Sequence, residues 1–155
     1  MSATPVLAPV KGRAVPMEQV PDPVFAQLMT GPGAAVDPAR EVLDVVAPVG
    51  GKLFKLYPHA FVILTPEGVA VLVHLGIDTV QLKGEGFTTL VTEGDELTVG
   101  QPVTIYDVPA IEAAGRNPIV PVIALDKQAT DLVLSGAVGS GADLTPTDTL
   151  FTVNG

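Results

Sequence analysis

The 155-residue chain contains no cysteine and no tryptophan, and it has only two histidines, His59 and His74. Without cysteine it can form neither disulfides nor thiolate metal sites, which fits a reducing compartment. Aromatic residues make up only 5% of the chain, so its core must be built from Val, Leu, Ile and Ala.

Basic residues are scarce as well. Eight Lys and Arg stand against 17 Asp and Glu, which gives a formal net charge of −9. A nucleic-acid phosphate backbone needs a basic stripe that this composition does not provide, so nucleic acid is not an expected partner. An acidic protein is better matched to a partner with a basic face, because opposite fields speed their encounter.

Long hydrophobic runs are also missing. No segment approaches the roughly 20 apolar residues of a membrane span. The start Met1-Ser-Ala-Thr-Pro5 lacks the charged and apolar regions of a signal peptide. We therefore expect a cytoplasmic protein that does not insert directly into a membrane.

Proline and glycine, in contrast, are abundant. Fifteen prolines and 16 glycines divide the chain into short pieces, which favours an all-β domain over a helix bundle. The length predicts one domain. Regular turn signals separate apolar runs of strand length, and this spacing is typical of a β-sandwich or barrel. The clearest predicted strands are residues 42–46, 61–64, 69–73, 102–106 and 119–125.

Two segments carry helix signals. Residues 107–115 offer Asp107 as a cap, an early proline and a closing glycine, and residues 22–29 offer Asp22 as a cap before Pro23. A short internal echo is also present. Residues 8–12 (APVKG) and 47–51 (APVGG) each precede an extended segment, which raises the hypothesis of two quasi-equivalent halves.

Both histidines lie at the edges of apolar, β-branched runs. His74 interrupts residues 69–80 and His59 opens residues 59–64. Residues two apart share a face of a strand, so His74 should point with Leu72 and Gly76, and His59 with Phe61 and Ile63. The missing side chain of Gly76 leaves room for a ligand or a backbone segment beside His74.

The two rings are expected to meet. If the strands form a hairpin across the turn at residues 66–68, positions that sum to about 133 are opposite, and His59 then faces His74. For either histidine alone, a purely structural role is the simpler interpretation. A chain with only two histidines seldom places them opposite each other by accident, so the pair favours a functional site.

Three kinds of chemistry suit such a pair. A metal site needs a third ligand, for which Asp78 is the candidate. Hydrolysis through a Ser-His-Asp arrangement needs a serine elbow, a context that Ser2, Ser135 and Ser140 do not have. Phosphoryl acceptance needs one neutral imidazole with a free Nε2, an Nδ1–H held by a backbone carbonyl, and a second imidazole as donor. The residues present favour the third.

Residues 73–87, VHLGIDTVQLKGEGF, resemble the phosphorylation-site signature of the glucose-type enzyme IIA of the bacterial phosphoenolpyruvate-dependent sugar phosphotransferase system. Agreement continues at residues 8–12, 20–25, 47–51, 58–61, 93–95 and 138–139. The resemblance implies a single enzyme IIA-like domain over residues 1–155, with an ordered core at about 5–153. It also implies a largely antiparallel β-sandwich of the barrel-sandwich type, with one or two short helical turns and both histidines in a shallow apolar depression.

The resemblance also implies the function. His74 matches the residue that accepts a phosphoryl group on Nε2 from the phosphocarrier protein HPr and passes it to a cysteine on the IIB domain of a sugar permease. His59 matches the second histidine, which stabilises the bound group and serves onward transfer. Gly76 matches the residue whose carbonyl holds the Nδ1–H of the nucleophile. No cofactor and no metal ligand is implied.

The expected partner surface surrounds these residues. Asp22 and Asp78 match acidic positions that face arginines of HPr. Four more residues match apolar contact positions: Val24, Phe25, Leu72 and Val80. The departure from the family is at Tyr57-Pro58-His59, where many relatives have a threonine two residues before the histidine and a loop about two residues longer.

One other function stays open beside phosphotransfer, and a second is excluded by the number of histidines. The chain could be a regulatory binding protein whose phosphorylation state signals sugar uptake, since some relatives bind unrelated permeases and metabolic enzymes. A zinc peptidase of the related sandwich type predicts a His-x-His pair and a further His-x-x-x-Asp set. Two histidines 15 residues apart cannot supply those ligands.

Overall fold

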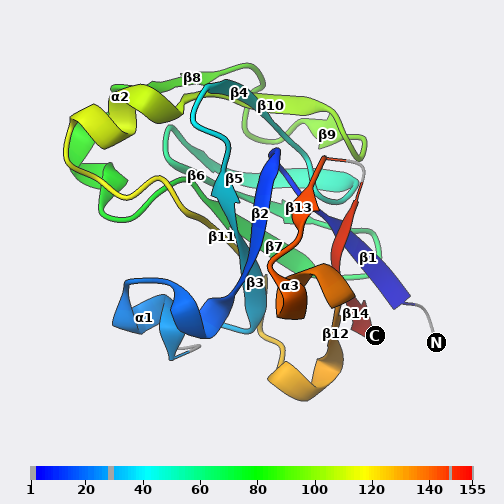
Figure 1. The fold of residues 1–155 in the computed structure, drawn as a ribbon. Coiled ribbons are helices and arrows are strands. Elements are labelled where there is room, and N and C mark those ends of the chain that lie inside the picture. Colours follow the sequence, from blue (N-terminus) through cyan, green and yellow to red (C-terminus); the bar gives the residue numbers. More distant parts are fainter. Residues whose placement is uncertain (1–2, 28–29, 147, 155) are drawn as a thin grey trace.

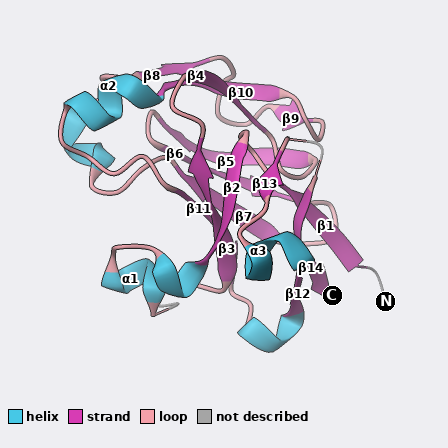
Figure 2. Ribbon diagram, viewed as in Figure 1, coloured by secondary structure: helices cyan, strands magenta, loops and turns pink. Residues whose placement is uncertain are grey.

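The computed structural model describes residues 3–27, 30–146 and 148–154. Strands dominate it, and the helical pieces lie at its periphery (Figure 2). The strands are β1 Ala3–Leu7, β2 Gly12–Pro16, β3 Gly33–Pro38, β4 Val42–Val46, β5 Gly51–Tyr57, β6 Ala60–Leu64, β7 Ala70–His74, β8 Phe87–Thr89, β9 Glu96–Leu97, β10 Pro102–Asp107, β11 Val120–Leu125, β12 Leu132–Leu134, β13 Asp143–Leu144 and β14 Thr149–Asn154. The helices are α1 Pro23–Ala26, α2 Val108–Ala113 and α3 Gly136–Ser140, with 3-10 turns η1 Met17–Gln19, η2 Thr79–Leu82 and η3 Ala129–Asp131.

The strands form one large sheet and two small ones. The large sheet has the order β13-β2-β3-β11-β7-β6-β5-β9, and the small sheets have the orders β4-β10-β8 and β1-β14-β12. All recorded pairings are antiparallel. Figure 1 shows the β4-β10-β8 sheet along the top and the β1-β14-β12 sheet at the lower right, with the large sheet between them. The predicted all-β, largely antiparallel sandwich is confirmed.

The predicted elements correspond closely to observed ones. The five predicted strands are β4, β6, β7, β10 and β11, with bounds that differ by at most one residue at each end. Both predicted caps are present, because Asp22 accepts a hydrogen bond from the Val24 amide and Asp107 from the Ala110 amide. Residues 28–29, the end of the first predicted helical segment, lie outside the described residues. The structure adds α3 and the three 3-10 turns to the two predicted helices.

Aliphatic side chains fill the core, as the composition requires. In β7 the alternate residues Val71 and Val73 are fully buried, as are Phe61 and Ile63 of β6. A second, smaller cluster lies apart from this main core. It consists of Val15, Met17, Val20, Phe25, Ala35, Ile77, Ile119 and Ile123, with Leu72 and Leu125 packed against it. Among the described residues, no helix is long and apolar enough to cross a bilayer.

The chain folds as two interleaved structural repeats. One repeat runs from β4 to β10, and the other combines β1–β3 with β11–β14. The echo segments cross at their junction, where the Leu7 amide donates to Pro48 at 3.0 Å and the Val46 amide donates to Pro9 at 2.9 Å. This reciprocal pair is what a twofold relation requires. The echo therefore marks equivalent positions in the two repeats.

The relation extends through the strand pairings. The β1–β14 pair has a register shift next to the Val6–Phe151 match, and the β4–β10 pair has one next to the Val45–Thr104 match. In the large sheet, β2 is flanked by β13 and β3, and β5 is flanked by β9 and β6. The two repeats meet at the centre of this sheet, where β7 pairs with β11.

Candidate functional site

The structure brings the two histidine rings together. Their centroids are 5.2 Å apart and their planes are inclined by 76°, an edge-to-face arrangement. His74 is the last residue of β7, whereas His59 lies in the turn between β5 and β6. Both side chains are half-buried. One ring is therefore fixed by a strand and the other by a tight turn.

The predicted hairpin register is wrong by one residue. Opposite positions in β6 and β7 sum to 134, so His74 faces Ala60, and His59 lies just beyond the ladder. The cause is the loop Pro66-Glu67-Gly68, which is centred on Glu67 and has Gly68 at a φ of +90°. The rings still meet because the His59 carbonyl accepts a hydrogen bond from the Leu75 amide at 2.7 Å.

The predicted face of His59 is also wrong. Phe61 and Ile63 point into the main core with the β7 valines, so they lie on the opposite side of the sheet from His74. His59 does not follow their alternation because it precedes the paired part of β6. Its ring therefore turns toward His74 instead of the core.

A backbone carbonyl orients His74. Nδ1 lies 2.6 Å from the Gly76 carbonyl, an atom that can only accept, so Nδ1 carries the proton of this hydrogen bond. Gly76 has a φ of +86°, and a Cβ there would lie 2.5 Å from Thr79 Cγ2. Only glycine fits this backbone. The space beside Gly76 is therefore taken by the chain's own side chains and backbone, and no room is left for a ligand there.

Aromatic rings extend the pair on both sides. The Phe25 ring, from α1, lies 5.2 Å from the His74 ring, and the Tyr57 ring lies 5.9 Å from the His59 ring. Tyr57 lies beside His59 through its ring, at the position before Pro58. Within the described part of the chain, the structure shows no hydrogen bond to the His59 ring. The four rings form one continuous row.

Burial lowers the pKa of both histidines. For His74, burial is the main cause, and it outweighs the Gly76 hydrogen bond and the carboxylates of Asp22 and Asp78, which act to raise the pKa. For His59, burial is again the main cause, followed by repulsion from a protonated His74. Both rings are therefore neutral near pH 7. The His74 tautomer held by Gly76 leaves the Nε2 lone pair free.

Known proteins share this sequence pattern. The family model described as "phosphoenolpyruvate-dependent sugar phosphotransferase system, EIIA 1" matches residues 4–130. The chain belongs to this family. A glucose-specific EIIA component from Halalkalibacterium halodurans is 42% identical over 120 residues, covering 76% of this chain and 68% of the relative. The same kind of component from Staphylococcus aureus is 41% identical, covering 76% of this chain and 71% of the relative.

A solved structure agrees over almost the full length. The glucose permease IIA from Mycoplasma capricolum superposes with a TM-score of 0.86 at 31% sequence identity, covering 98% of this chain and 96% of that one. Membership of the EIIA family makes this chain a phosphotransferase component of a sugar phosphotransferase system. A component of such a system works with phosphocarrier and permease components.

Apart from Leu72 of β7, the residues that the EIIA resemblance assigned to partners lie on the two segments that flank His74. Asp22, Val24 and Phe25 come from the start of α1, and Asp78 and Val80 from η2 and its cap. Val24 is 47% exposed and Val80 is 60% exposed, whereas Phe25 is only 8% exposed. The Phe25 ring packs against His74.

Leu72 is half-buried and packs against the smaller cluster beneath Phe25. Within residues 3–27, 30–146 and 148–154, no group of three His, Cys, Asp or Glu side chains is placed to hold a metal ion. Asp78 is exposed and acts on His74 through its charge.

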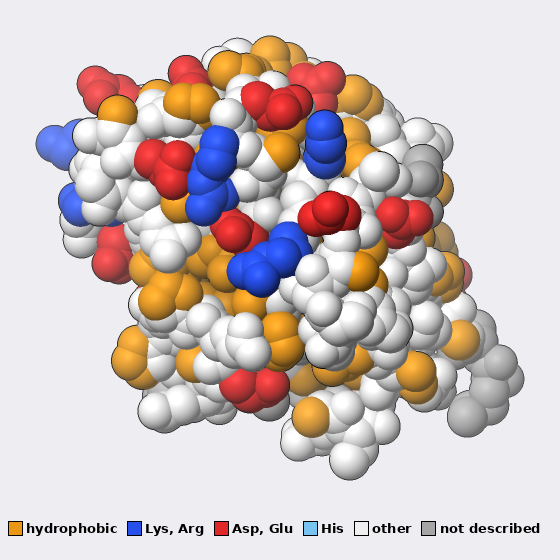
Figure 3. Space-filling view, viewed as in Figure 1, with side chains coloured by type: hydrophobic (Ala, Val, Ile, Leu, Met, Phe, Trp, Pro, Cys, Tyr) orange, Lys and Arg blue, Asp and Glu red, His pale blue; other side chains and the backbone are white. Residues whose placement is uncertain are grey.

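Another surface of this EIIA protein has a different charge pattern. Figure 3 shows Lys and Arg side chains next to Asp and Glu side chains across the middle of one face. Among the described residues, Arg40 pairs with Asp37 at 2.8 Å and with Glu112 of α2 at 2.9 Å. Surface pairs of this kind contribute little stability, but they balance the basic charge locally. Asp22 and Asp78 beside the histidines have no such ion pair within the described residues.

Sequence reasoning missed three supports of the site. Thr79 is fully buried, and its hydroxyl donates to the Leu75 carbonyl at 2.6 Å. Asn117 and Ile119 accept backbone hydrogen bonds from the loop after His74. Thr79 lies within the signature segment, so its position was a usable signal. The sequence held no such signal for Asn117 and Ile119, because more than 40 residues separate them from His74.

Proposed function

We propose that this chain is the phosphocarrier of its system, with His74 accepting a phosphoryl group from phosphorylated HPr and passing it to a cysteine on the IIB domain of a permease. One observation carries the proposal. The Gly76 carbonyl holds Nδ1 of His74 at 2.6 Å, and this leaves Nε2 as the nucleophile of a neutral ring. No cofactor takes part.

The step is a simple exchange of bonds. The Nε2 lone pair forms a bond to phosphorus while the bond between phosphorus and the donor atom of HPr breaks, and that electron pair returns to HPr. The His74 ring becomes cationic as it bonds. The Gly76 carbonyl and the charges of Asp22 and Asp78 stabilise that cation, since each acts to raise the pKa of the ring.

His59 is proposed to steady the transferred group. Its ring lies 5.2 Å from that of His74, so an imidazole N–H can reach an oxygen of a phosphoryl group on Nε2. A neutral His59 still has one N–H to donate. The same donor can follow the group as it leaves toward the permease cysteine, which supports a larger role in delivery than in acceptance.

The surroundings suit a partner that binds briefly. Phe25 and Leu72 keep water from one side of the ring, which protects a labile phosphohistidine. Val24 and Val80 are proposed as apolar contacts, and Asp22 and Asp78 as the charges that attract arginines of HPr. Charge complementarity of this kind raises the rate of encounter more than the affinity. We propose the cytoplasm as the place of reaction.

The test is direct. The chain is incubated with phosphoenolpyruvate, enzyme I and HPr, and its intact mass is measured. The expected result is the addition of one phosphoryl group that is labile in acid and stable in alkali. No addition, or an addition that survives acid, would contradict a phosphohistidine. Omission of HPr is the control, and it should leave the chain unmodified.

A further inference from the structure

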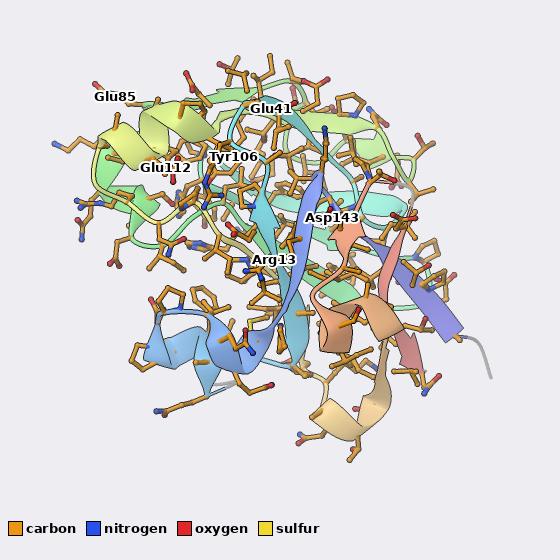
Figure 4. All side chains as sticks on the ribbon, viewed as in Figure 1. Arg13, Glu41, Glu85, Tyr106, Glu112 and Asp143 are labelled. Carbon is orange, nitrogen blue, oxygen red and sulfur yellow. The ribbon has the colours of Figure 1, made fainter. Side chains whose placement is uncertain are left out.

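Tyr106 of β10 is a buried side chain with a specific hydrogen bond. It is fully buried, its ring stacks on that of Phe87 at 5.5 Å, and its hydroxyl donates to the Pro118 carbonyl at 2.8 Å. Tyr106 lies beneath α2 in Figure 4. Burial raises the pKa of the Tyr106 hydroxyl, so it remains a donor throughout the physiological range. A buried hydroxyl of this kind costs free energy unless its bond is made.

The bond acts on the segment that supports the site. Pro118 lies between Asn117 and Ile119, whose carbonyls accept hydrogen bonds from the two residues that follow Leu75. The Gly76 amide donates to Ile119 at 3.0 Å, and the Ile77 amide donates to Asn117 at 2.9 Å. Tyr106 therefore holds the middle residue of a segment that is bonded on both sides to the loop after His74.

The hydroxyl also lies beside this loop. A Cβ placed on Gly76 would lie only 3.1 Å from the Tyr106 hydroxyl, so no side chain fits between this oxygen and the Gly76 backbone. The next atoms along this backbone are those of the carbonyl that holds His74 Nδ1 at 2.6 Å. The buried Tyr106 hydroxyl therefore lies next to the residue whose carbonyl orients His74.

We propose that the Tyr106 hydroxyl is a positioning group for His74, which keeps the Gly76 carbonyl aimed at Nδ1 and so holds the ring in the tautomer with a free Nε2. The inference rests on the proposed function for its catalytic meaning. Tyr106 acts on His74 indirectly, through the Pro118 segment and Gly76, so it is a positioning residue. Groups that orient a histidine through its other nitrogen affect both its tautomer and its basicity.

Tyr106→Phe tests this because it removes one oxygen and keeps the ring that stacks on Phe87. We expect the protonated-Nδ1 tautomer of His74 to lose its dominance in imidazole nitrogen NMR spectra. The pKa of His74 should fall further, since the Gly76 bond raises it. Phosphorylation by phosphorylated HPr should slow by about tenfold, the lower end of the cost of losing a histidine-orienting partner at metal sites.

Thr104→Val is the matched control. Thr104 lies on the same strand and is fully buried, but its hydroxyl has no hydrogen-bond partner among the described residues. This variant should leave the tautomer, the pKa and the rate of His74 unchanged. If Tyr106→Phe lowers thermal stability while all three His74 properties stay at the wild-type values, the hydroxyl has only a structural role and the proposal is overturned.

Two further readouts separate the possible failures. In the unmodified protein, the Tyr106 hydroxyl proton should exchange slowly and show a nuclear Overhauser effect to the Gly76 α protons. Absence of this nuclear Overhauser effect would overturn the proposal without the need for a variant. The tautomer measurement needs no partner protein, so it still reports on positioning if His74 proves not to be the phosphorylated residue. Failure of labelling with an intact tautomer effect would count against the proposed function and not against Tyr106.

Discussion

The two structural repeats have the same backbone arrangement but carry different side chains at equivalent positions. In one repeat the Leu75 amide donates to His59 at 2.7 Å, and in the other the Ala124 amide donates to Pro32 at 2.9 Å. His74 pairs with Ala60 as Ile123 pairs with Gly33. Pro32 and Ile123 therefore occupy the positions of the two histidines. The fold offers two equivalent places for a site, and only one of them carries imidazoles.

The connections explain why the two places differ. A turn of Pro58 and His59 joins β5 to β6, whereas residues 17–32, including η1 and α1, join β2 to β3. This long connection lays Phe25 on the ring of His74. It also covers Ile123, which is fully buried in the same small cluster. The site is therefore built from both repeats. The two-residue turn between β5 and β6 is too short to cover Ile123 in the way that the long connection covers His74.

The backbone after the two positions differs as well. Gly76 turns its carbonyl back to His74 through a φ of +86°, whereas Leu125 continues strand β11. Without that turn, a ring at position 123 would have no carbonyl to fix its tautomer. A shared scaffold is thus not enough for function. The difference depends on one glycine, one long connection and two imidazoles.

The largest expected effect comes from His74, the proposed nucleophile. His74→Ala should abolish acceptance of phosphate from phosphorylated HPr, because no other group in the row of rings has a free nitrogen held in place. Intact mass measures the outcome. Ile123→Val makes a mild change at the equivalent position of the other repeat and should be labelled normally. Labelling of His74→Ala would remove the assignment.

The second effect separates acceptance from delivery. His59→Gln should still be labelled, but transfer to the permease should fall by at least about 100-fold, the lower range for loss of a group that assists the transferring charge. Sugar phosphorylation with purified permease measures it. Pro32→Ala, at the equivalent position, should change neither step. Normal sugar phosphorylation by His59→Gln would remove the proposed role of the second ring.

The third effect tests the repeats themselves. A Cβ on Gly12 would collide with the Asp37 carbonyl, and one on Gly51 with the Leu64 carbonyl. Each change to Ala should lower the free energy of unfolding by about 3 kcal/mol, as overpacking against backbone does. Gly51→Ala should cost more, because its φ of +155° also disfavours a side chain.

Gly139→Ala is the control for these two glycines. Gly139 lies in α3, and a Cβ placed on it would have no other described atom within 4 Å. The change should leave stability unchanged or slightly raised. Urea denaturation measures all three variants. A large loss for only one of Gly12 and Gly51 would show that the two positions are not equivalent.

The smallest effect concerns pH. Because burial lowers the pKa of His74 and His59, the folded protein binds fewer protons than the unfolded chain below about pH 6.5. The free energy of unfolding should therefore fall as the pH drops through that region. Acceptance of phosphate should persist at a pH where a free imidazole is already protonated.

Phe25→Ala removes the cover that the long connection provides. The pKa of His74 should move back toward its ordinary value, as NMR titration of the ring would show. Val133→Ala, at an exposed position on β12, serves as the control and should not move it. An unchanged His74 pKa in Phe25→Ala would mean that the ring owes its neutrality to other groups.

Much of the site was accessible from the sequence. The scarcity of histidine drew attention to His59 and His74, and the turn signals placed them on neighbouring strands. The register was missed because a single residue in the Pro66-Glu67-Gly68 loop shifts the ladder, and turn length is hard to fix from composition alone. Phe25 is predicted at a partner contact, and the packing of its ring against His74 was not accessible from the sequence.

The sequence alone determined the all-β class, the helix caps and the choice of two imidazoles, because these follow from local periodicity and from residue type. The family resemblance assigned the oriented nitrogen to His74, but only the tertiary structure decided what holds the Gly76 carbonyl in place. That orientation depends on Gly76, on the carbonyls of Asn117 and Ile119, and on a buried hydroxyl at Tyr106. Segments distant along the chain meet there only because the two repeats interleave around β7 and β11, which no local pattern specifies.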